Sequence, residues 1–421
     1  MSMRGARSIL DRLLLPEGVA EVALSLLIAR ALRGFGDGYV AVLLPAYLLS
    51  LGLDQLDVGY VSTATLSGSA LATMAIAVVG YRWSTRGLLL SAALLMLITG
   101  ISFASISSFW PLLIIAFIGT LNPSSGDVSL FLPLEHARLA QAAQGNARTA
   151  LFARYSLLGS LSAATGALAA GIPSLLVTWS GLPLIDGLRG MFMLYGLLGG
   201  SVWLLYRTLP KATMHARQLS APLGPSRPIV FKLAALFSVD AFAGGLLVNS
   251  LLTLWLFERF GMSLGQAGIF FSCTELLSAV SQLAAPAIAR RIGLLNTMVF
   301  THIPANMCLI LAAIAPSVEV ALPLLFMRSA LSQMDVPTRT AYVMAVVTPA
   351  ERAAAASFTA IPRSLASAAS PTLAGALLAS GLLSAPLLAC GALKIVYDLA
   401  LLASFRRLDV PLDRNDSWRE R

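Results

Sequence analysis

The sequence has 421 residues, of which 57% are hydrophobic and only 12% are charged, and its formal net charge is +9. About a quarter of the residues of a typical soluble domain are charged. The composition therefore excludes a water-soluble globular protein and predicts that lipid covers much of the surface. Cys273, Cys308 and Cys390 lie in apolar runs without zinc-binding spacing, so we expect no metal and no disulfide.

Twelve apolar segments follow one another along the chain, and each approaches or exceeds the roughly 20 residues that a membrane-spanning helix needs. We predict spans at 20–49, 57–79, 87–107, 110–134, 147–171, 188–207, 229–257, 266–288, 294–315, 321–347, 354–379 and 383–405. The basic, proline-containing segment 208–228 lies in the middle. The pattern predicts an all-α membrane protein with two six-helix bundles, 1–207 and 229–421, and 208–228 as a cytoplasmic linker.

The placement of basic residues predicts the orientation. With the N-terminus in the cytoplasm, nearly all Lys and Arg in the connections fall on the cytoplasmic side, and the outside loops hold Arg189 and Arg259. The positive-inside rule then places both termini in the cytoplasm. We expect a multi-pass protein of the plasma membrane, in bacteria the inner membrane. Because the positive charge is split among short loops on one membrane face, we expect no nucleic-acid partner.

The second half of the chain repeats polar features of the first half at similar spacing. The segment GDVSLFLP corresponds to QMDVPTRT, and an arginine precedes a glycine by twelve residues in both 154–166 and 363–375. The corresponding positions are Asp37 and Asp240, Asp127 and Asp335, and Arg154 and Arg363. Two six-helix repeats usually enclose a central site that opens alternately to each side of the membrane.

Twelve spans in a six-plus-six repeat with a central basic loop resemble the major facilitator superfamily (MFS), and RALRGFGDGYVAVLLPAYLLSLGL resembles first spans of its bacterial members. The resemblance covers residues 20–405. The loop signature of that family, G-x-L-x-D-R-x-G-R, corresponds here to GYRWSTRGL, which keeps Gly80 and Gly87 but has Ser84 at the aspartate position. The resemblance implies the MFS fold, a central cavity, alternating access and a monomer.

Ionisable residues inside the predicted spans cost at least about 2.5 kcal/mol each at mid-bilayer, so they should face a cavity or one another. Seven are cationic and six are acidic: Arg30, Arg33, Arg154, Arg328, Arg339, Arg363 and Lys394 against Asp37, Asp127, Asp240, Glu275, Asp335 and Asp398. The near balance of charge favours mutual pairing. For Lys394 and Asp398, one turn apart in the last span, we expect a pair within the helix.

Helical geometry sorts the polar residues into stripes that can face a cavity. The candidate substrate and coupling residues are Arg30, Arg33, Asp37, Asn122, Ser125, Asp240, Glu275, Gln282, Arg328 and Arg363. An unpartnered buried carboxylate can carry a proton, which makes Glu275 a coupling candidate. The alternative is that these side chains only satisfy one another or a neighbouring helix. For His302 in the ninth span we expect a structural role.

The stretch TLNPSSGDVSLFLP, residues 120–133, interrupts an apolar span with polar side chains. Pro123 and Gly126 predict a weakened helix that can bend. We expect Asp127–Arg154 and Asp335–Arg363 to form two symmetric ion pairs that close the cytoplasmic side. The full set of gate candidates is Asp127, Arg154, Asp335, Arg339 and Arg363.

The sequence contains no HExxH, GxSxG or P-loop pattern, so we expect no enzyme activity, no cofactor and no direct use of ATP. The leading hypothesis is secondary active transport of a small solute, with protons as the coupling ion and efflux by antiport as the direction. Uptake of a small organic or inorganic anion is the second hypothesis, favoured by the arginines. A non-transporting membrane receptor or scaffold is the third. The expected partners are a small-molecule substrate, protons and the lipid bilayer.

Overall fold

The computed structural model describes residues 15, 19–20, 22–124, 129–210, 223–348 and 351–406, which are mostly α-helical. The chain divides into two compact units. The first comprises Met1–Arg217, Val248–Leu276 and Pro371–Ser380, and the second comprises Gln218–Leu247, Leu277–Ser370 and Gly381–Arg421. The first unit therefore includes two segments that follow the central linker in sequence.

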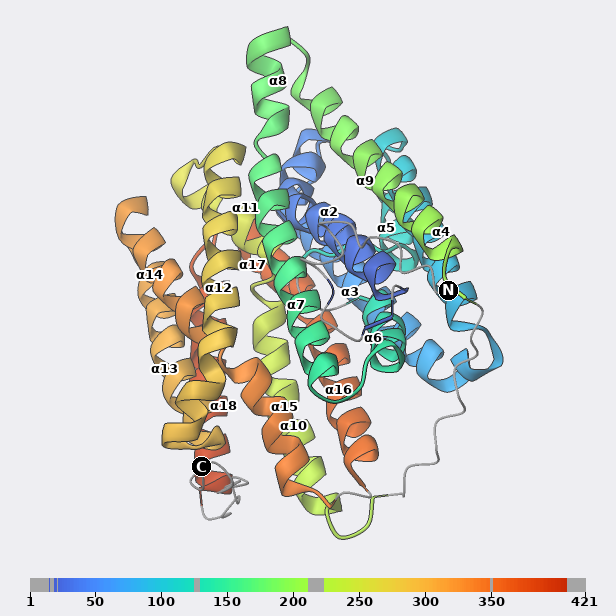
Figure 1. Cartoon of the computed structure of the whole chain (residues 1–421). Helices are drawn as coiled ribbons and strands as arrows, with labels where there is room; N and C mark the ends of the chain where they lie inside the picture. The colour runs from blue at the N-terminus through green and yellow to red at the C-terminus, as the bar shows by residue number, and fades with distance from the viewer. Residues whose placement is uncertain are drawn as a thin grey trace. The chain divides into compact units, whose positions relative to one another are not determined.

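The first unit is built on the helices of the first half of the chain. They are α2 (Val22–Ser50), α3 (Gln55–Val79), the short 3₁₀ helix η1 (Gly80–Arg82), α4 (Thr85–Ser105), α5 (Phe109–Ile118), α6 (Phe131–Ala142), α7 (Gly145–Ala169), α8 (Ile172–Ser180) and α9 (Leu184–Arg207). Two later helices, α11 (Asn249–Phe260) and α17 (Pro371–Ala379), and the beginning of α12 (Leu264–Ile292) complete the unit. Helices α4 and α9 pack side by side, as do α2 and α7 (Figure 1).

The second unit contains the remaining helices. They are α10 (Arg227–Gly245), most of α12 (Leu264–Ile292), α13 (Leu294–Ala313), α14 (Val318–Ser332), α15 (Asp335–Val346), α16 (Arg352–Ala369) and α18 (Ala385–Phe405). Helix α10 packs against α16 and α18, and α13 packs against α14 and α18.

Eight stretches of the described chain are long and apolar enough to cross a membrane. They are Gln55–Val78, Thr85–Ser105, Ala147–Ser180, Leu184–Arg207, Arg227–Phe260, Leu264–Ile292, Leu294–Ala313 and Ala385–Phe405. The third and the fifth each join two consecutive helices into a stretch of 34 residues. These stretches agree with the predicted all-α membrane fold.

Four predicted spans are interrupted rather than continuous. The breaks lie between α5 and α6, α10 and α11, α14 and α15, and α16 and α17. The stretch predicted as one weakened helix at 110–134 is thus two helices. Pro123 cannot continue a helix, and the Asn122 side-chain oxygen accepts hydrogen bonds from the backbone N–H of Ser124 at 3.1 Å and from its hydroxyl at 2.8 Å. Asn122 therefore stabilises a turn at the break.

Small residues allow the helices of the first unit to approach closely. A Cβ on Gly38 of α2 would lie 2.1 Å from the carbonyl oxygen of Ala163 on α7. A Cβ on Gly100 of α4 would lie 2.2 Å from the backbone nitrogen of Gly196 on α9. Close backbone contact of this kind is the usual basis of helix association in membranes, where lipid removes the hydrophobic driving force.

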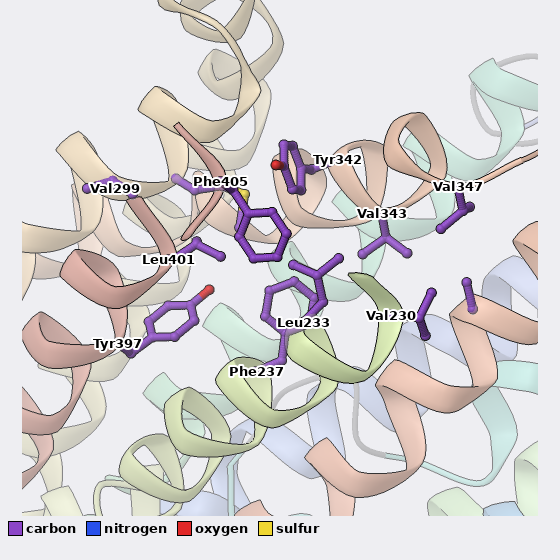
Figure 2. Close-up of a cluster of buried hydrophobic side chains, with 12 residues drawn as sticks. Val230, Leu233, Phe237, Val299, Tyr342, Val343, Val347, Tyr397, Leu401 and Phe405 are labelled. Atoms are coloured by element: carbon purple, nitrogen blue, oxygen red, sulfur yellow. The ribbon is translucent and has the colours of Figure 1, made fainter. Parts of the chain in front are cut away.

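A buried apolar cluster holds the second unit together (Figure 2). Its members come from α10, α13, α15, α16, α18 and the residue after α15: Val230, Leu233, Phe237, Met298, Val299, Tyr342, Val343, Val347, Ala355, Tyr397, Leu401 and Phe405. Phe237, Tyr342 and Tyr397 each lie three residues from a charged side chain on the same helix, which is buried for the first two and half-buried for the third. The cluster therefore fixes the helices that carry the charges described below.

Candidate substrate and proton site

A carboxylate without solvent exposure, Glu135 on α6, is the centre of a polar network in the first unit. It accepts hydrogen bonds from the guanidinium of Arg33 on α2, from the hydroxyl of Tyr155 on α7, and from the hydroxyl of Tyr206 on α9 at 2.5 Å. The Arg33 guanidinium also lies 4.2 Å from the ring centroid of Phe131. We call Arg33, Glu135, Tyr155 and Tyr206 the Glu135 network.

The Glu135 network ties four helices of the first unit together. Removing two charges from water costs several kcal/mol per ion unless good geometry and further hydrogen bonds compensate. Here the two tyrosine hydroxyls supply those further bonds to Glu135. In this network Arg33 and Glu135 therefore balance each other's charge, and Nε of Arg33 has no hydrogen-bond partner.

Asp37 lies one turn after Arg33 on α2 and is only 7% exposed. The Arg33 guanidinium donates to Glu135, and no hydrogen bond or ion pair joins the Asp37 carboxylate to any residue within the described ranges. Arg30, one turn before Arg33 on α2, lies 5.3 Å from the ring centroid of Tyr155. It also packs closely on Gly159, because a Cβ added to that glycine would lie 2.3 Å from the Arg30 Nε. Asp37 thus has a buried carboxylate that makes no hydrogen bond or ion pair with a described residue.

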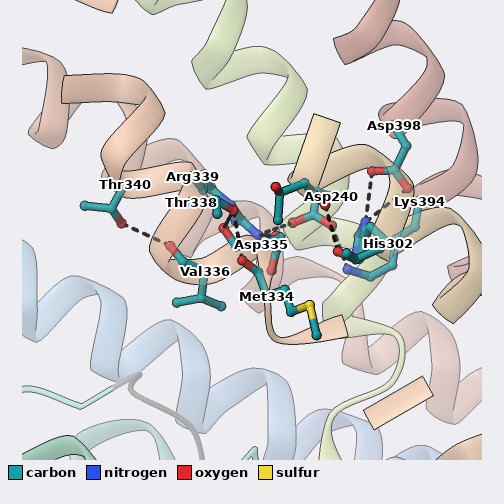
Figure 3. A network of polar contacts seen from close by, with 12 residues as sticks. Asp240, His302, Met334, Asp335, Val336, Thr338, Arg339, Thr340, Lys394 and Asp398 are labelled. Carbon is teal, nitrogen blue, oxygen red and sulfur yellow. Dashed lines mark hydrogen bonds and ion pairs between the residues drawn. The ribbon is translucent and has the colours of Figure 1, made fainter. Parts of the chain in front are cut away.

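Four charged side chains form a second network in the second unit. Asp240 on α10 binds the ammonium group of Lys394 on α18 at 2.6 Å and the guanidinium of Arg339 on α15 at 3.2 Å. The same Arg339 nitrogen, Nη2, also binds Asp335 (Figure 3). We call Asp240, Asp335, Arg339 and Lys394 the Asp240 network. It joins α10, α15 and α18.

The expected pair between Lys394 and Asp398 within α18 does not form. Lys394 binds Asp240, and the Asp398 carboxylate instead binds Nδ1 of His302 on α13 at 2.9 Å (Figure 3). Asn306 adds a longer contact to Asp398 at 3.4 Å. Lys394 and Asp398 thus each bind a side chain on another helix, and these contacts replace the expected pair within α18.

The gate pair predicted between Asp335 and Arg363 is not formed either. Asp335 instead contacts Arg339, one turn further along α15, because the first turn of that helix places both side chains on one face. Arg363 is exposed on α16. Asp127, the acidic member of the other predicted pair, lies outside the described residues, and its proposed partner Arg154 is half-buried on α7.

The remaining candidate residues are spread over several helices. Asn122 is buried at the break after α5, and Ser125 lies outside the described residues. Glu275 and Gln282 are half-buried on α12, and Arg328 is half-buried on α14. The Nε of Arg328 is buried without a hydrogen-bond partner. The structure thus gathers Arg33 with the Glu135 network and Asp240 with Arg339, but not the whole predicted set.

The first unit also contains a close contact between α3 and α17. The hydroxyl of Thr63 accepts a hydrogen bond from the backbone N–H of Thr372 at 3.0 Å and lies 2.8 Å from the Thr372 hydroxyl. A Cβ on Gly59 of α3 would lie 3.0 Å from the Cα of Gly375 on α17. A first-half helix and a second-half helix thus meet through small and hydroxyl-bearing residues, which we call the α3–α17 contact.

The family is decided by the match of the chain to known sequences. Residues 26–334 match the model of the Major Facilitator Superfamily. The chain belongs to this family. An uncharacterized membrane protein of Saccharomyces cerevisiae, YJR124C, is 23% identical over 419 residues, which cover 91% of this chain and 94% of the yeast protein.

Solved structures of family transporters share the fold. The nucleoside transporter NupG has a TM-score of 0.71 at 17% identity, with 92% of this chain and 100% of NupG covered. A bacterial homolog of the human lysosomal transporter Spinster, in an inward-facing and occupied conformation, has a TM-score of 0.67 at 16% identity, with 91% and 94% covered. The protein is therefore a multi-pass integral membrane protein with an MFS transporter fold.

Proposed function

We propose that this protein is a secondary active transporter that moves a small solute by alternating access and couples the movement to protons. The observation that carries the proposal is the buried Asp37 carboxylate, which has no hydrogen bond or ion pair to a described residue. Such a carboxylate can gain and lose a proton without breaking a network. We assign the proton to Asp37.

The other buried carboxylates support this assignment by contrast. Glu135 accepts three hydrogen bonds, one of them from a guanidinium. Asp240 holds two cations. Protonating either group would leave buried donors or cations without a partner, which costs more than protonating a group that has none. These two networks therefore have positioning roles in the proposal.

The α3–α17 contact supports alternating access. Its closest contacts are backbone approach at Gly59 and hydroxyl contacts at Thr63. Hydroxyl contacts of this kind can be exchanged for contacts with water when the surfaces separate. We assign this contact to the gate opposite the cytoplasmic ends. The helix breaks, such as that between α16 and α17, supply places where one half of a span can move.

For topology and location we propose what the sequence predicts. Both termini lie in the cytoplasm in this proposal, because the positive-inside rule places the connections that are rich in Lys and Arg on that side. We place twelve spans in the bacterial inner membrane, with four of them each made of two helices. We also keep the monomer that the family resemblance implies.

Efflux in exchange for protons is the first direction proposed, and uptake of an anion with protons is the second. Arg363, a cation without an ion pair among the described residues, favours an anionic solute in both cases. Exporting a monoanion against an incoming proton moves charge across the membrane, whereas importing both together moves none. A clamped membrane potential therefore separates the two directions.

The proposal is tested with purified protein in liposomes under an imposed pH gradient. Accumulation of solutes from a metabolite panel is measured by mass spectrometry for the wild type, Asp37→Asn and the control Asp186→Asn, whose carboxylate is exposed on α9. The gradient should drive solute movement in the wild type and the control but not in Asp37→Asn. Gradient-driven movement that survives in Asp37→Asn would refute the assignment.

A further inference from the structure

Two arginines of the second unit have N–H groups that form no hydrogen bond with the described part of the chain. Arg363 on α16 makes no hydrogen bond or ion pair with the described part of the chain. Arg339 is only 7% exposed and binds both its carboxylates through Nη2, which leaves Nε and Nη1 buried without a partner. Buried N–H groups of a guanidinium are costly to leave unsatisfied. Among the arginines of the described chain, Arg339 is the one with two buried nitrogens that have no partner, so a water or a ligand is expected to complete them.

The position of Arg363 directs it toward α10 rather than toward lipid. Thr359, Arg363 and Ser367 recur at four-residue spacing, and Ser370 continues their stripe. That stripe packs on α10, because the Ser370 hydroxyl donates to the carbonyl of Phe242 at 2.6 Å. Arg363 is therefore exposed on the face of α16 that meets the helix carrying Asp240.

Arg363 also lies within electrostatic reach of the Asp240 network, since its charge interacts with those of Arg339, Asp240 and Asp335. The network itself contains two carboxylates, Asp240 and Asp335, and two cations, Arg339 and Lys394. Arg363 adds one further positive charge. His302 and Asp398 pair with each other, and the charge of Asp398 also interacts with those of Asp240 and Lys394. The five side chains of the Asp240 network and Arg363, taken by themselves, are therefore one negative charge short of balance.

We propose that Arg363, together with the uncommitted N–H groups of Arg339, binds the carboxylate of a small organic monoanion. A guanidinium matches a carboxylate in shape and can bind it through two parallel hydrogen bonds. A single negative charge balances the cluster, whereas a dianion would reverse the imbalance inside the membrane.

This inference rests on the proposed function, because it names the substrate class of the same transporter. Its test measures binding in detergent, which needs no proton gradient. Thermal unfolding is followed with sodium benzoate, sodium lactate and sodium phosphate at constant ionic strength, with benzamide and lactamide as the uncharged counterparts. Variants Arg363→Gln, Arg363→Lys and Arg352→Gln are compared. Arg352 is exposed on the same helix and serves as the matched control for loss of a charge.

At least one carboxylate should raise the melting temperature of the wild type while its amide does not. Arg363→Gln should weaken that binding about tenfold or more, as expected for loss of a charged hydrogen bond. Arg352→Gln should retain the affinity, and Arg363→Lys should retain part of it. Monodisperse elution and an unchanged melting temperature without ligand show that Arg363→Gln is folded.

Three outcomes would overturn the inference: no carboxylate exceeds its amide, Arg363→Gln binds as the wild type does, or only phosphate responds. The proposed function fails separately. Binding that depends on Arg363 together with transport that ignores protons would refute the coupling and leave this site standing. Proton-coupled transport of carboxylates that is unchanged in Arg363→Gln would refute this site and leave the proton coupling standing.

Discussion

Lys394 on α18 and Asp240 on α10 form a buried ion pair, with the lysine Nζ 2.6 Å from a carboxylate oxygen. Their helices lie far apart in the sequence, and the pair joins them inside the second unit. Because Asp240 also binds Arg339, this one carboxylate links three helices. The pair therefore stabilises the fold and sets the charge balance beside Arg363.

Replacing Lys394 by Met should destabilise the protein. The change leaves Asp240 and Asp335 facing Arg339 alone, and breaking a buried ion pair by removing one partner typically costs about 3–5 kcal/mol. Thermal unfolding in detergent measures the effect. Adding Asp240→Asn to Lys394→Met should restore part of the loss, whereas Lys232→Met, on the exposed side of α10, should change little. Equal stability of Lys394→Met and the wild type would contradict the pair.

Glu135→Gln should destabilise the first unit. The variant leaves the Arg33 guanidinium, which is 2% exposed, without the carboxylate that it binds. The expected loss is again about 3–5 kcal/mol. A double variant, Arg33→Gln with Glu135→Gln, removes both charges and should be more stable than Glu135→Gln alone. Additive losses in this cycle would argue against direct coupling.

Locking the α3–α17 contact should stop transport. Thr63→Cys and Thr372→Cys, introduced after replacement of Cys273, Cys308 and Cys390, place two thiols where two hydroxyl oxygens lie 2.8 Å apart. Oxidation should form a disulfide and abolish solute flux in liposomes, and reduction should restore it. Either single cysteine variant is the control. Full flux through the oxidised, cross-linked protein would show that this contact need not open.

Stability should depend on Glu351 at acidic pH. Glu351 accepts hydrogen bonds from the Thr348 hydroxyl at 2.6 Å and from the backbone N–H of Gly224, and hydrogen bonds from Ser226, Thr348 and Gly224 lower its pKa to about 2. A depressed folded-state pKa gives stability above the ordinary value of 4.5, and this stability is lost as the pH falls toward 2.

The measurement for Glu351 is thermal unfolding over a pH series from neutral to strongly acidic. Glu351→Gln should unfold at a lower temperature than the wild type at neutral pH, and the difference should narrow between pH 4.5 and 2. Glu258→Gln, which changes an exposed carboxylate on α11, is the control. A difference that stays constant with pH would show that the ionised form of Glu351 is not what stabilises the fold.

Hydropathy predicted where most helices lie, but not where they break. The apolar pattern of 229–257 continues through Leu246, Leu247 and Val248, where α10 ends and α11 begins. The local signals at that point are the glycine pair at 244–245, which ends α10, and Asn249, which begins α11. Hydropathy alone does not register them. At 120–133 the signal was present in Asn122 and Pro123, and it was strong enough to separate two helices rather than only weaken one.

Long-range charge pairing was the harder part of the site to predict. The predicted span ends at Leu134 because polar residues follow, which left Glu135 outside the candidate set. A helical pattern was nonetheless visible, since Phe131, Leu134, Glu135 and Arg138 share one buried face of α6. For Lys394, one sequence cannot tell which helix faces α18, so the local partner was favoured over Asp240, the partner that the fold supplies.

The central claim is that solute movement is coupled to a proton carried by Asp37. Its most direct test is proton release from purified protein in weakly buffered detergent solution, followed with a pH indicator after addition of a solute shown to bind. The wild type should release protons when the solute binds, and Asp37→Asn should bind the solute and release none. Equal proton release by the two proteins, or none by the wild type, would contradict the account.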